Sequence, residues 1–431
     1  MCAVPPGTGR SRKRADGRVA GGFRPRLYLS AAGLYVRFTP VARLIAFIII
    51  FIGLAAGFPA PAGAAAPELA LTAAGPAEMV FRWRTDACAP DDIPDAPARA
   101  FRDEAGTVHL FAAHYINRAL LGSSLDAVRP DCAVAFMGDK LDDPEKFDDR
   151  IWLAAFHTDD GRTIAALAHA EFHGHRRPAL CPSRQYSACW WNAVLGLVSH
   201  DGGRRFERAP GAGAVVAALP YAFDASAGRP TGYFGPSNIL TLNGAQYAFV
   251  FAEEWRDQKR GACLLRTRTP LDPTSWRAWD GAEFAVALTR AGASDGPPAK
   301  HVCTPVPGLG STMAAIVRHA PTGAIVGLFA AKRRNAETGT DATGIWYATS
   351  RDLLRWSEPR LLLEAPLMFA YSCGAKAVYA YPSLLDPASA SRNFDSVSGR
   401  AYLYLTRFNM AGCTLTMDRD LVRFPVRIAP P

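Results

Sequence analysis

The chain has 431 residues, of which 49% are hydrophobic and 20% charged, so it can bury a sizeable core and is not of a disordered class. Its net charge of +9 is concentrated at the N-terminus: residues 1–66 hold nine Lys or Arg and one acid, and the rest holds 39 basic and 38 acidic residues. A nearly neutral body without a Lys/Arg cluster excludes a phosphate-binding surface, and we expect no nucleic-acid partner.

Residues 1–66 have the pattern of an export signal. A basic stretch runs into LIAFIIIFIGLAAGF (44–58), and small residues follow. These are the parts of a secretory signal peptide, with cleavage expected near residues 64–66. We therefore expect a secreted or periplasmic protein, anchored in the membrane only if this leader is not cleaved. Residues 67–84 are expected to form an N-terminal extension to one domain at 85–431.

Eight cysteines follow Cys2 of the leader. In an oxidising compartment an even number predicts a disulfide framework, here four bridges. The sequence does not fix their pairing, but the short separation of Cys181 and Cys189 makes this the pair that we expect. No C-x-x-C motif is present, so a structural role is favoured over metal binding.

Five similar segments recur along residues 85–431. In each, a short apolar strand leads into a turn that contains aspartate, usually followed by an aromatic residue. These aspartates are Asp126, Asp201, Asp272, Asp352 and Asp420, separated by 75, 71, 80 and 68 residues. Alternating strands joined at D-G, N-G or T-G turns complete each segment, which is the signature of β-hairpins. The pattern predicts an all-β fold, a five-bladed β-propeller; a pair of β-sandwiches would not explain the spacing.

Two short motifs carry a resemblance to known families. SHDGGRRF (199–206) resembles the Asp box of sialidases, and SRDLLRW (350–356) resembles a strand ending of five-bladed glycosidases of the arabinanase, xylosidase and invertase type. The residues that match the Asp box are Ser199, Asp201, Gly203 and Phe206. The resemblance implies a propeller and a glycoside hydrolase that acts on an oligo- or polysaccharide. Sialidases are six-bladed with repeated boxes, so a true sialidase is not expected.

Glycoside hydrolysis needs one ionised and one protonated carboxyl group. The resemblance places a base in an Asp-Pro segment before the innermost strand of the first blade. DDIPDAPARAF (91–101) has Asp95 there, although Asp-Ala-Pro replaces the direct step, and Asp92 is a second possibility. The central acid of the family has no clear counterpart, so chemistry decides. It favours Glu171, which follows a strand of the second blade, with Glu253 and Glu254 in reserve.

The segment LAHAEFHGH (167–175) contains three of the nine histidines of the chain. We expect His169 and His173 to hydrogen-bond Glu171 or to tune its pKa. In a second interpretation the segment only organises a loop. In a third, His169, His173 and His175 form the metal site of a hydrolase or lyase, although their spacing differs from H-E-x-x-H. Our prediction includes no metal and no cofactor.

Sugars bind to flat apolar faces and to hydrogen-bond donors and acceptors at the openings of blades. The residues expected there, besides the two histidines, are Asp92, Arg99, Trp191, Asn192, Asn238, Tyr381 and Arg407. Successive strand residues face opposite sides, so only one of the pair Trp190 and Trp191 is expected to face a ligand. We expect a monomer. A glycan-binding propeller without catalysis is the competing function: it would keep the aromatic residues and arginines but would not require two carboxyl groups to meet.

Overall fold

The computed structural model describes residues 69–209, 214–289 and 296–430. The chain separates after Ala62 into two units. The first unit and the expected cleavage site lie outside the described residues, so the fold below is that of the second unit. Its helices are α1 (Trp83–Asp86) and the 3-10 turns η1 (Pro144–Lys146), η2 (Gly174–Arg176), η4 (Ala225–Ala227), η5 (Pro273–Ser275) and η6 (Pro298–His301). None of these described helices has the length and apolar character that a membrane span requires.

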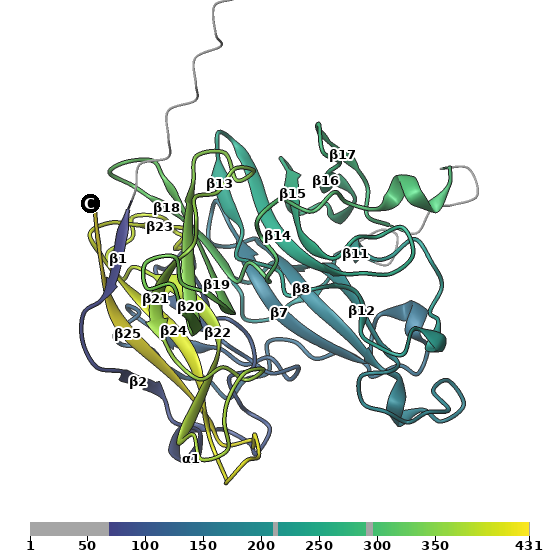
Figure 1. Cartoon of the computed structure of the whole chain (residues 1–431), viewed down its shortest axis with the longest axis horizontal. Helices are drawn as coiled ribbons and strands as arrows, with labels where there is room; N and C mark the ends of the chain where they lie inside the picture. Colours follow the sequence, from purple (N-terminus) through teal and green to yellow (C-terminus); the bar gives the residue numbers. More distant parts are fainter. Residues whose placement is uncertain (1–68, 210–213, 290–295, 431) are drawn as a thin grey trace, which may run out of the picture. The chain divides into compact units, whose positions relative to one another are not determined.

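The described strands form four sheets, of which one has eleven strands and contains a parallel pairing of β12 with β9. Division of this sheet at the parallel pairing gives five successive antiparallel groups, here called blades I to V (Figure 1). Blade I contains β3 (Arg99–Arg102), β4 (Val108–Phe111), β5 (Leu120–Gly122) and β6 (Arg129–Pro130). Blade II contains β7 (Arg150–His157), β8 (Ile164–His173), β9 (Trp190–Ser199), β10 (Glu207–Arg208) and β11 (Val215–Ala217). Blade III contains β12 (Thr231–Phe234), β13 (Leu240–Leu242), β14 (Ala245–Glu253), β15 (Gly261–Thr267), β16 (Arg277–Trp279) and β17 (Phe284–Val286).

Blade IV contains β18 (Ala315–His319), β19 (Ile325–Arg334), β20 (Asp341–Ser350) and β21 (Arg360–Glu364). Blade V contains β22 (Ala377–Leu385), β24 (Arg400–Asn409) and β25 (Arg419–Ala429), and β23 (Ser396–Val397) from its loop pairs with β18 of blade IV. The N-terminal strands β1 (Ala70–Ala73) and β2 (Glu78–Phe81) pair with β25, so both chain ends meet in blade V (Figure 1). The expected extension 67–84 therefore contributes strands to the propeller.

Apolar side chains fill the space between neighbouring blades and close them into a ring. One cluster joins blades I, II and III through residues such as Phe101, Leu153 and Val250. A second joins III and IV, a third IV and V, and a fourth V and I, where Tyr404 packs with Leu110. Each strand alternates between two such interfaces, because successive side chains point to opposite faces of a blade. The all-β fold and the five-bladed propeller are confirmed.

The turns follow the sequence in part. Asn243 and Gly244 both have positive φ in the hairpin between β13 and β14, as a tight hairpin turn requires. The Asp201 and Asp352 carboxylates accept backbone N–H groups of the next residues, and so does Asp272. Asp126 also lies in a turn, between β5 and β6, and its carboxylate pairs with Arg423. Asp420 differs, because it lies inside β25 and pairs with Arg407. The prediction of an aspartate turn in every blade was therefore wrong for Asp420.

Arg99 ties the five blades together at their centre. It belongs to blade I and is 2% exposed. Its guanidinium donates to the carbonyl oxygens of Ala154 in blade II (2.9 Å), Pro236 before β13 in blade III (3.3 Å) and Ala314 at the start of blade IV (2.5 Å), and to the hydroxyl of Ser383 in blade V (3.2 Å). One side chain thus satisfies acceptors from four other blades.

Replacing Arg99 by methionine should destabilise the ring. The substitution keeps much of the apolar stem but leaves four buried acceptors without their donor, and we expect the free energy of unfolding to fall by about 3 kcal/mol or more. Denaturant unfolding followed by tryptophan fluorescence measures this. Arg266→Met is the matched control, because Arg266 is half-buried over Phe284 and makes no side-chain hydrogen bond in the described residues. Equal losses in both variants would contradict the role given to Arg99.

All eight cysteines pair, as predicted. The bridges are Cys88–Cys132, Cys181–Cys189, Cys263–Cys303 and Cys373–Cys413. The expected short bridge is confirmed and closes the loop between β8 and β9. The last bridge joins the loop before β22 to the loop before β25. Two loops that border the cavity described below are therefore held covalently.

Candidate functional site

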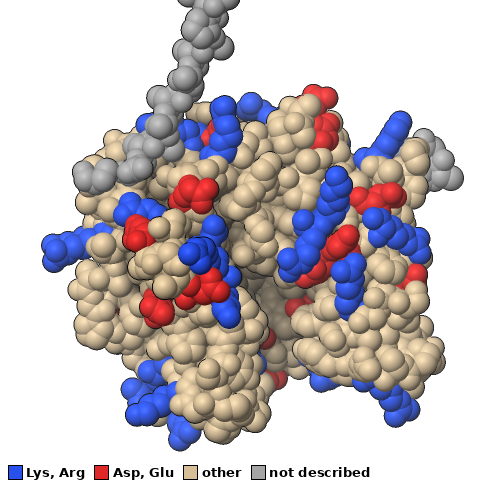
Figure 2. Space-filling model, viewed as in Figure 1, with Lys and Arg blue, Asp and Glu red and all other residues tan. Residues whose placement is uncertain are grey.

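A cavity of about 710 Å³ lies at the centre of the ring, with walls from all five blades. Figure 2 shows the molecule hollowed near the middle of this view, with acidic side chains inside the hollow. The carbonyl-bearing residues that hold Arg99, namely Ala154, Pro236 and Ala314, also line the cavity. Of the predicted site residues, the lining includes Asp95, His169, Glu171, His173, Asn192 and Tyr381.

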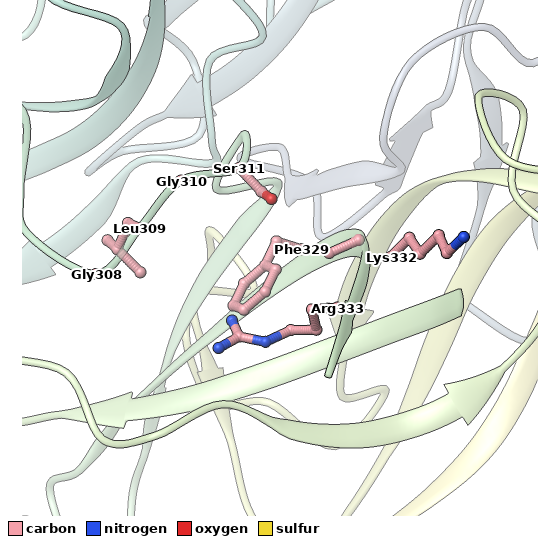
Figure 3. Close-up of a pocket in the computed structure, with 8 residues that line it drawn as sticks. Gly308, Leu309, Gly310, Ser311, Phe329, Lys332 and Arg333 are labelled. Atoms are coloured by element: carbon pink, nitrogen blue, oxygen red, sulfur yellow. The ribbon is translucent and has the colours of Figure 1, made fainter. Parts of the chain in front are cut away.

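A second hollow of about 150 Å³ lies at blade IV, between the loop 308–311 and the side chains of Phe329, Lys332 and Arg333 (Figure 3). None of its eight lining residues, all of them described, is an acid or a histidine. It therefore has no carboxyl group, whereas the central cavity contains four, and the central cavity is the candidate active site.

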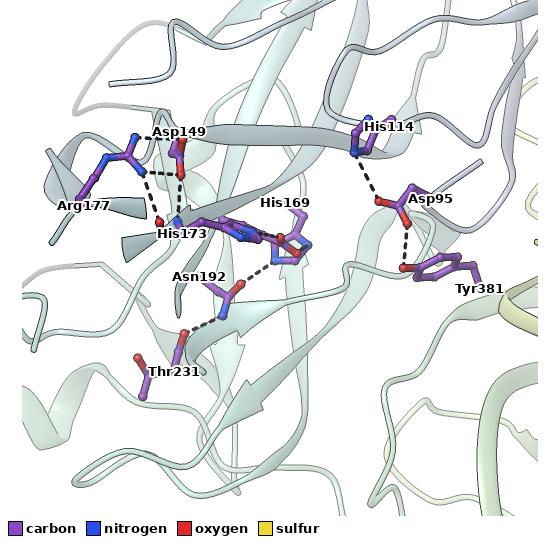
Figure 4. Close-up of polar contacts among 10 residues, drawn as sticks. Asp95, His114, Asp149, His169, His173, Arg177, Asn192, Thr231 and Tyr381 are labelled. Carbon is purple, nitrogen blue, oxygen red and sulfur yellow. Dashed lines mark hydrogen bonds and ion pairs between the residues drawn. The ribbon is translucent and has the colours of Figure 1, made fainter. Parts of the chain in front are cut away.

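The strand β8 brings Glu171 and two histidines to one face. His169, Glu171 and His173 are two residues apart, so they point the same way, while Ala168, Ala170 and Phe172 point into the core between blades. The end of β8 is fixed by Asp149, which accepts the backbone N–H of His173 (2.9 Å) and two bonds from Arg177 (3.0 Å each) (Figure 4).

Glu171 is held by both histidines in a site with little water. Its Oε2 lies 2.7 Å from Nε2 of His173, and its Oε1 lies 3.5 Å from Nδ1 of His169, while the carboxyl side chain is 12% exposed. Burial, opposed by His169 and assisted by the Asp95 charge, raises the pKa of Glu171 to about 7. Burial also lowers the pKa of His169, and it lowers the pKa of His173 to about 4. Near neutral pH the three groups can therefore share one proton without a net charge.

Asn192 of β9 sets the proton position on His169. Its amide nitrogen donates to the carbonyl of Thr231 (2.8 Å), so its amide oxygen faces Nε2 of His169 (3.0 Å) (Figure 4). This hydrogen-bond network assigns the proton of neutral His169 to Nε2 and leaves the Nδ1 lone pair directed at Glu171. The rings of Trp152 and Phe234 lie 6.0 Å from the imidazole and hold its plane. Glu171 is thus arranged to carry a proton on Oε1.

Asp95 has the opposite surroundings. Its backbone N–H donates to Ala112 at the end of β4, which fixes the segment before β3. Its carboxylate accepts from Arg419 of blade V and from the hydroxyl of Tyr381 (3.1 Å), and Nε2 of His114 lies 3.8 Å away. The cavity therefore holds one carboxyl group paired with an arginine and a hydroxyl donor, and one, with a raised pKa, between two histidines.

A backbone irregularity in β22 directs Tyr381 at Asp95. Tyr381 has a φ of 57°, and the pairing of β22 with β24 shifts register between Ala380 and Ser383. Such bulges turn a side chain away from the regular alternation of a strand. Burial and the nearby Asp95 charge raise the pKa of Tyr381 well above 10, so its hydroxyl remains a donor.

The tryptophan pair faces opposite sides, but the assignment within the pair has to be corrected. Trp191 is 1% exposed and packs in the core between blades, whereas Trp190 lines the cavity. Tyr186, 57% exposed, stands at the rim with its ring 5.4 Å from that of Trp190. Phe369, 62% exposed, borders the cavity from blade V. The alternation of β9 explains the correction, because Trp190 and Asn192 share the face that points to the cavity.

Four other predicted binding residues lie outside the cavity lining and are occupied by protein partners. Arg99 supports the cavity floor, as described above. Asp92 accepts the backbone N–H of Cys88 (2.9 Å). Asn238 exchanges two hydrogen bonds with the backbone of Ile316 and so links blades III and IV. Arg407 pairs with Asp420 (2.7 Å). The corrections for Arg99 and Asn238 share one cause, because buried backbone groups between blades need polar side chains as partners.

Within the described residues, no group of three His, Cys, Asp or Glu side chains is placed to hold a metal ion. The reason is visible for the predicted histidine set. His169 and His173 face Glu171, whereas His175 belongs to η2 and packs against the tilted ring of Tyr186 (5.0 Å between ring centroids).

Three charged or titratable lining residues next to the two carboxyl groups were not predicted. His114 and Arg419 surround Asp95, and Arg150 lies opposite Glu171 in the pairing of β7 with β8. The sequence could have indicated Arg150, because it begins the strand that precedes LAHAEFHGH and pairs with it as a hairpin. No sequence signal links Asp95 to Arg419, 324 residues further on.

No family model matches the chain, and no curated protein matches it. Solved structures similar to it are glycoside hydrolases, the class that the two sequence motifs resemble. An α-L-arabinanase of Cellvibrio cellulosa is 12% identical with a TM-score of 0.44, over 77% of this chain and 91% of that one. An α-L-arabinofuranosidase of Lactobacillus brevis is 10% identical with a TM-score of 0.44, over 79% and 93%.

The catalytic domain of an α-L-arabinofuranosidase of Coprinopsis cinerea is 9% identical with a TM-score of 0.42, over 84% of this chain and 98% of that domain. At such values the likeness transfers no residue role and no activity to this chain.

Proposed function

We propose that this protein is a glycoside hydrolase in which Glu171 is the acid and Asp95 the ionised partner. The observation that carries the proposal is the placement of both carboxyl groups in one cavity, with surroundings that favour opposite protonation states. Cleavage of a glycosidic bond requires one protonated and one ionised carboxyl group. Trp190 and Tyr186 supply flat apolar faces on which a sugar ring can lie.

In the proposed reaction Glu171 gives its proton to the glycosidic oxygen as the bond to the anomeric carbon breaks. In one route Asp95 takes a proton from the water that attacks the anomeric carbon; Asp95 then releases that proton to solvent and Glu171 regains one from solvent. In the other route Asp95 itself attacks the anomeric carbon, and a water molecule that gives its proton to Glu171 then breaks the bond between the sugar and Asp95. Arg419 and Tyr381 hold the Asp95 carboxylate in position. No metal or cofactor is required by these steps.

We propose that the protein acts outside the cytoplasm. Its four disulfides support this, because such bridges persist in oxidising compartments. The leader, if cleaved as expected, would deliver the chain there, and we propose a monomer as the active form.

A panel of oligosaccharides, polysaccharides and aryl glycosides tests the proposed function, with release of reducing sugar as the readout. Turnover of at least one glycoside by the wild-type protein is expected. Sugar binding without turnover across the panel would instead indicate a glycan-binding propeller, and the two-carboxyl mechanism would be wrong.

The pH dependence of kcat should follow the protonation of Glu171. Because the acid must carry its proton and its pKa lies at about 7, activity is expected to fall as pH rises through about 7. An ordinary glutamate would place this limb more than two pH units lower. The measurement is kcat against pH from 4 to 9 on one substrate. A profile that is flat from pH 5 to 9 would contradict the assignment of Glu171 as the acid.

A further inference from the structure

The charges around the central cavity do not balance within the protein. The charged residues in its lining are Asp91, Asp95, Glu171, Glu253, Arg150, Arg176 and Arg419. Arg419 pairs with Asp95, and Glu253 pairs with Arg260 (3.0 Å). Glu171 is neutral below about pH 7, its raised pKa. Two arginines and Asp91 remain, so the Glu171 side of the cavity is cationic.

Of the two remaining arginines, Arg150 is the less exposed. It is half-buried and begins β7, directly opposite Glu171 in the pairing with β8. Its guanidinium lies over the ring of Tyr115, 5.0 Å from the centroid. It makes no hydrogen bond and no ion pair with any residue of the described ranges. A guanidinium presents five donors, and a half-buried one is costly to leave without acceptors.

Further cations surround the same wall. Arg176 in η2 is exposed, lines the cavity and has no ion pair among the described residues. Lys140 is exposed, and its Nζ lies 5.5 Å from the centroid of Tyr115, the ring on which Arg150 rests. Arg177, by contrast, is fully engaged by Asp142 and Asp149. On this wall of the cavity, Arg150, Arg176 and Lys140 are therefore the cations without an ion pair among the described residues.

We propose that the substrate carries a carboxylate, as a uronic acid residue does, and that Arg150 binds it with help from Arg176. The inference rests on the proposed function and names its substrate class. The planar fork of Arg150 matches a carboxylate with two parallel hydrogen bonds. Tyr115 holds the guanidinium plane, while Trp190 and Tyr186 offer faces for the sugar ring. Because Arg150 lies across from Glu171, the acidic sugar occupies the subsite next to the bond that is cleaved.

The test compares oligosaccharides of glucuronic and galacturonic acid with their methyl esters, which remove the charge and keep the shape. Binding is measured by calorimetry in the Glu171→Gln background, so that the ligand is not cleaved. Turnover is measured with Glu171 in place. The free acid should be preferred over the ester. Arg150→Gln should lower affinity for the acid by about 10- to 100-fold and leave affinity for the ester within about threefold. Arg150→Lys should keep part of the preference.

Arg266→Gln is the matched control, because Arg266 is also half-buried over an aromatic ring but lies outside the cavity. This substitution should change the affinity for neither the acid nor the ester. Thermal unfolding of each variant separates binding from folding. Uronides that bind without being hydrolysed would leave this inference standing and overturn the proposed function. Hydrolysis of neutral glycosides with no preference for acid over ester would overturn the inference and leave the proposed function standing. So would hydrolysis of sulfated sugars with a higher affinity than that for carboxylated ones.

Discussion

Glu171→Gln is expected to lower kcat by about 10²- to 10⁴-fold on a substrate with an unactivated leaving group. The amide keeps the size of the side chain and can still accept from His173, but it has no acidic proton to give to the glycosidic oxygen. Because the sugar contacts remain, KM should change by less than about threefold. The measurement is the initial rate of product release across a range of substrate concentrations.

Glu253→Gln is the control for this variant. Glu253 lines the same cavity, but its carboxylate is engaged in an ion pair with Arg260 at 3.0 Å. Its substitution should leave kcat within about threefold. A large loss in Glu253→Gln together with normal activity in Glu171→Gln would show that the acid belongs to blade III and that the role given to Glu171 is wrong.

Asp95→Asn is expected to lower kcat by a similar or larger factor, at least about 10²-fold. The substitution removes the negative charge that must attack or activate water, and it leaves Arg419 without its counter-ion in the cavity. Unlike the loss in Glu171→Gln, this loss should persist on every substrate, because no leaving group replaces the function of the base. Steady-state kinetics on the substrates of the first experiment provide the measurement.

Asp92→Asn is the matched control three residues earlier in the chain. The Asp92 carboxylate accepts the backbone N–H of Cys88 at 2.9 Å, and an asparagine oxygen can accept the same bond. Turnover in this variant should stay near that of the wild type. If Asp92→Asn lost activity and Asp95→Asn kept it, the ionised partner would have to be reassigned to Asp92.

Local periodicity was enough to predict much of the fold. The five segments, their hairpins and the short bridge between Cys181 and Cys189 all follow from patterns within about 20 residues, since alternation and turn residues act locally. The same holds for Glu171 with His169 and His173, whose spacing of two on one strand brings them to one face. The count of five blades was correct although Asp420 lies inside a strand and does not mark a turn.

Contacts between distant segments were not accessible in the same way. Arg419 and Tyr381 meet Asp95 across 324 and 286 residues of sequence, and only closure of the ring places them together. Arg99 was predicted to bind sugar as an arginine that could clamp a carboxylate, and Asn238 because it lies where an innermost strand begins. The structure shows that such positions also have to satisfy backbone groups of the neighbouring blades. A single sequence does not separate these two uses of a polar residue.

The central claim is a division of roles between the two carboxyl groups, and the dependence of rate on the leaving group tests it most directly. On aryl glycosides of the preferred sugar, Glu171→Gln should lose little kcat/KM when the phenol is strongly acidic and progressively more as its pKa rises, because a good leaving group needs no proton. Asp95→Asn should lose the same large factor across the series. Parallel losses in both variants, independent of the phenol, would contradict the assignment of Glu171 as the acid.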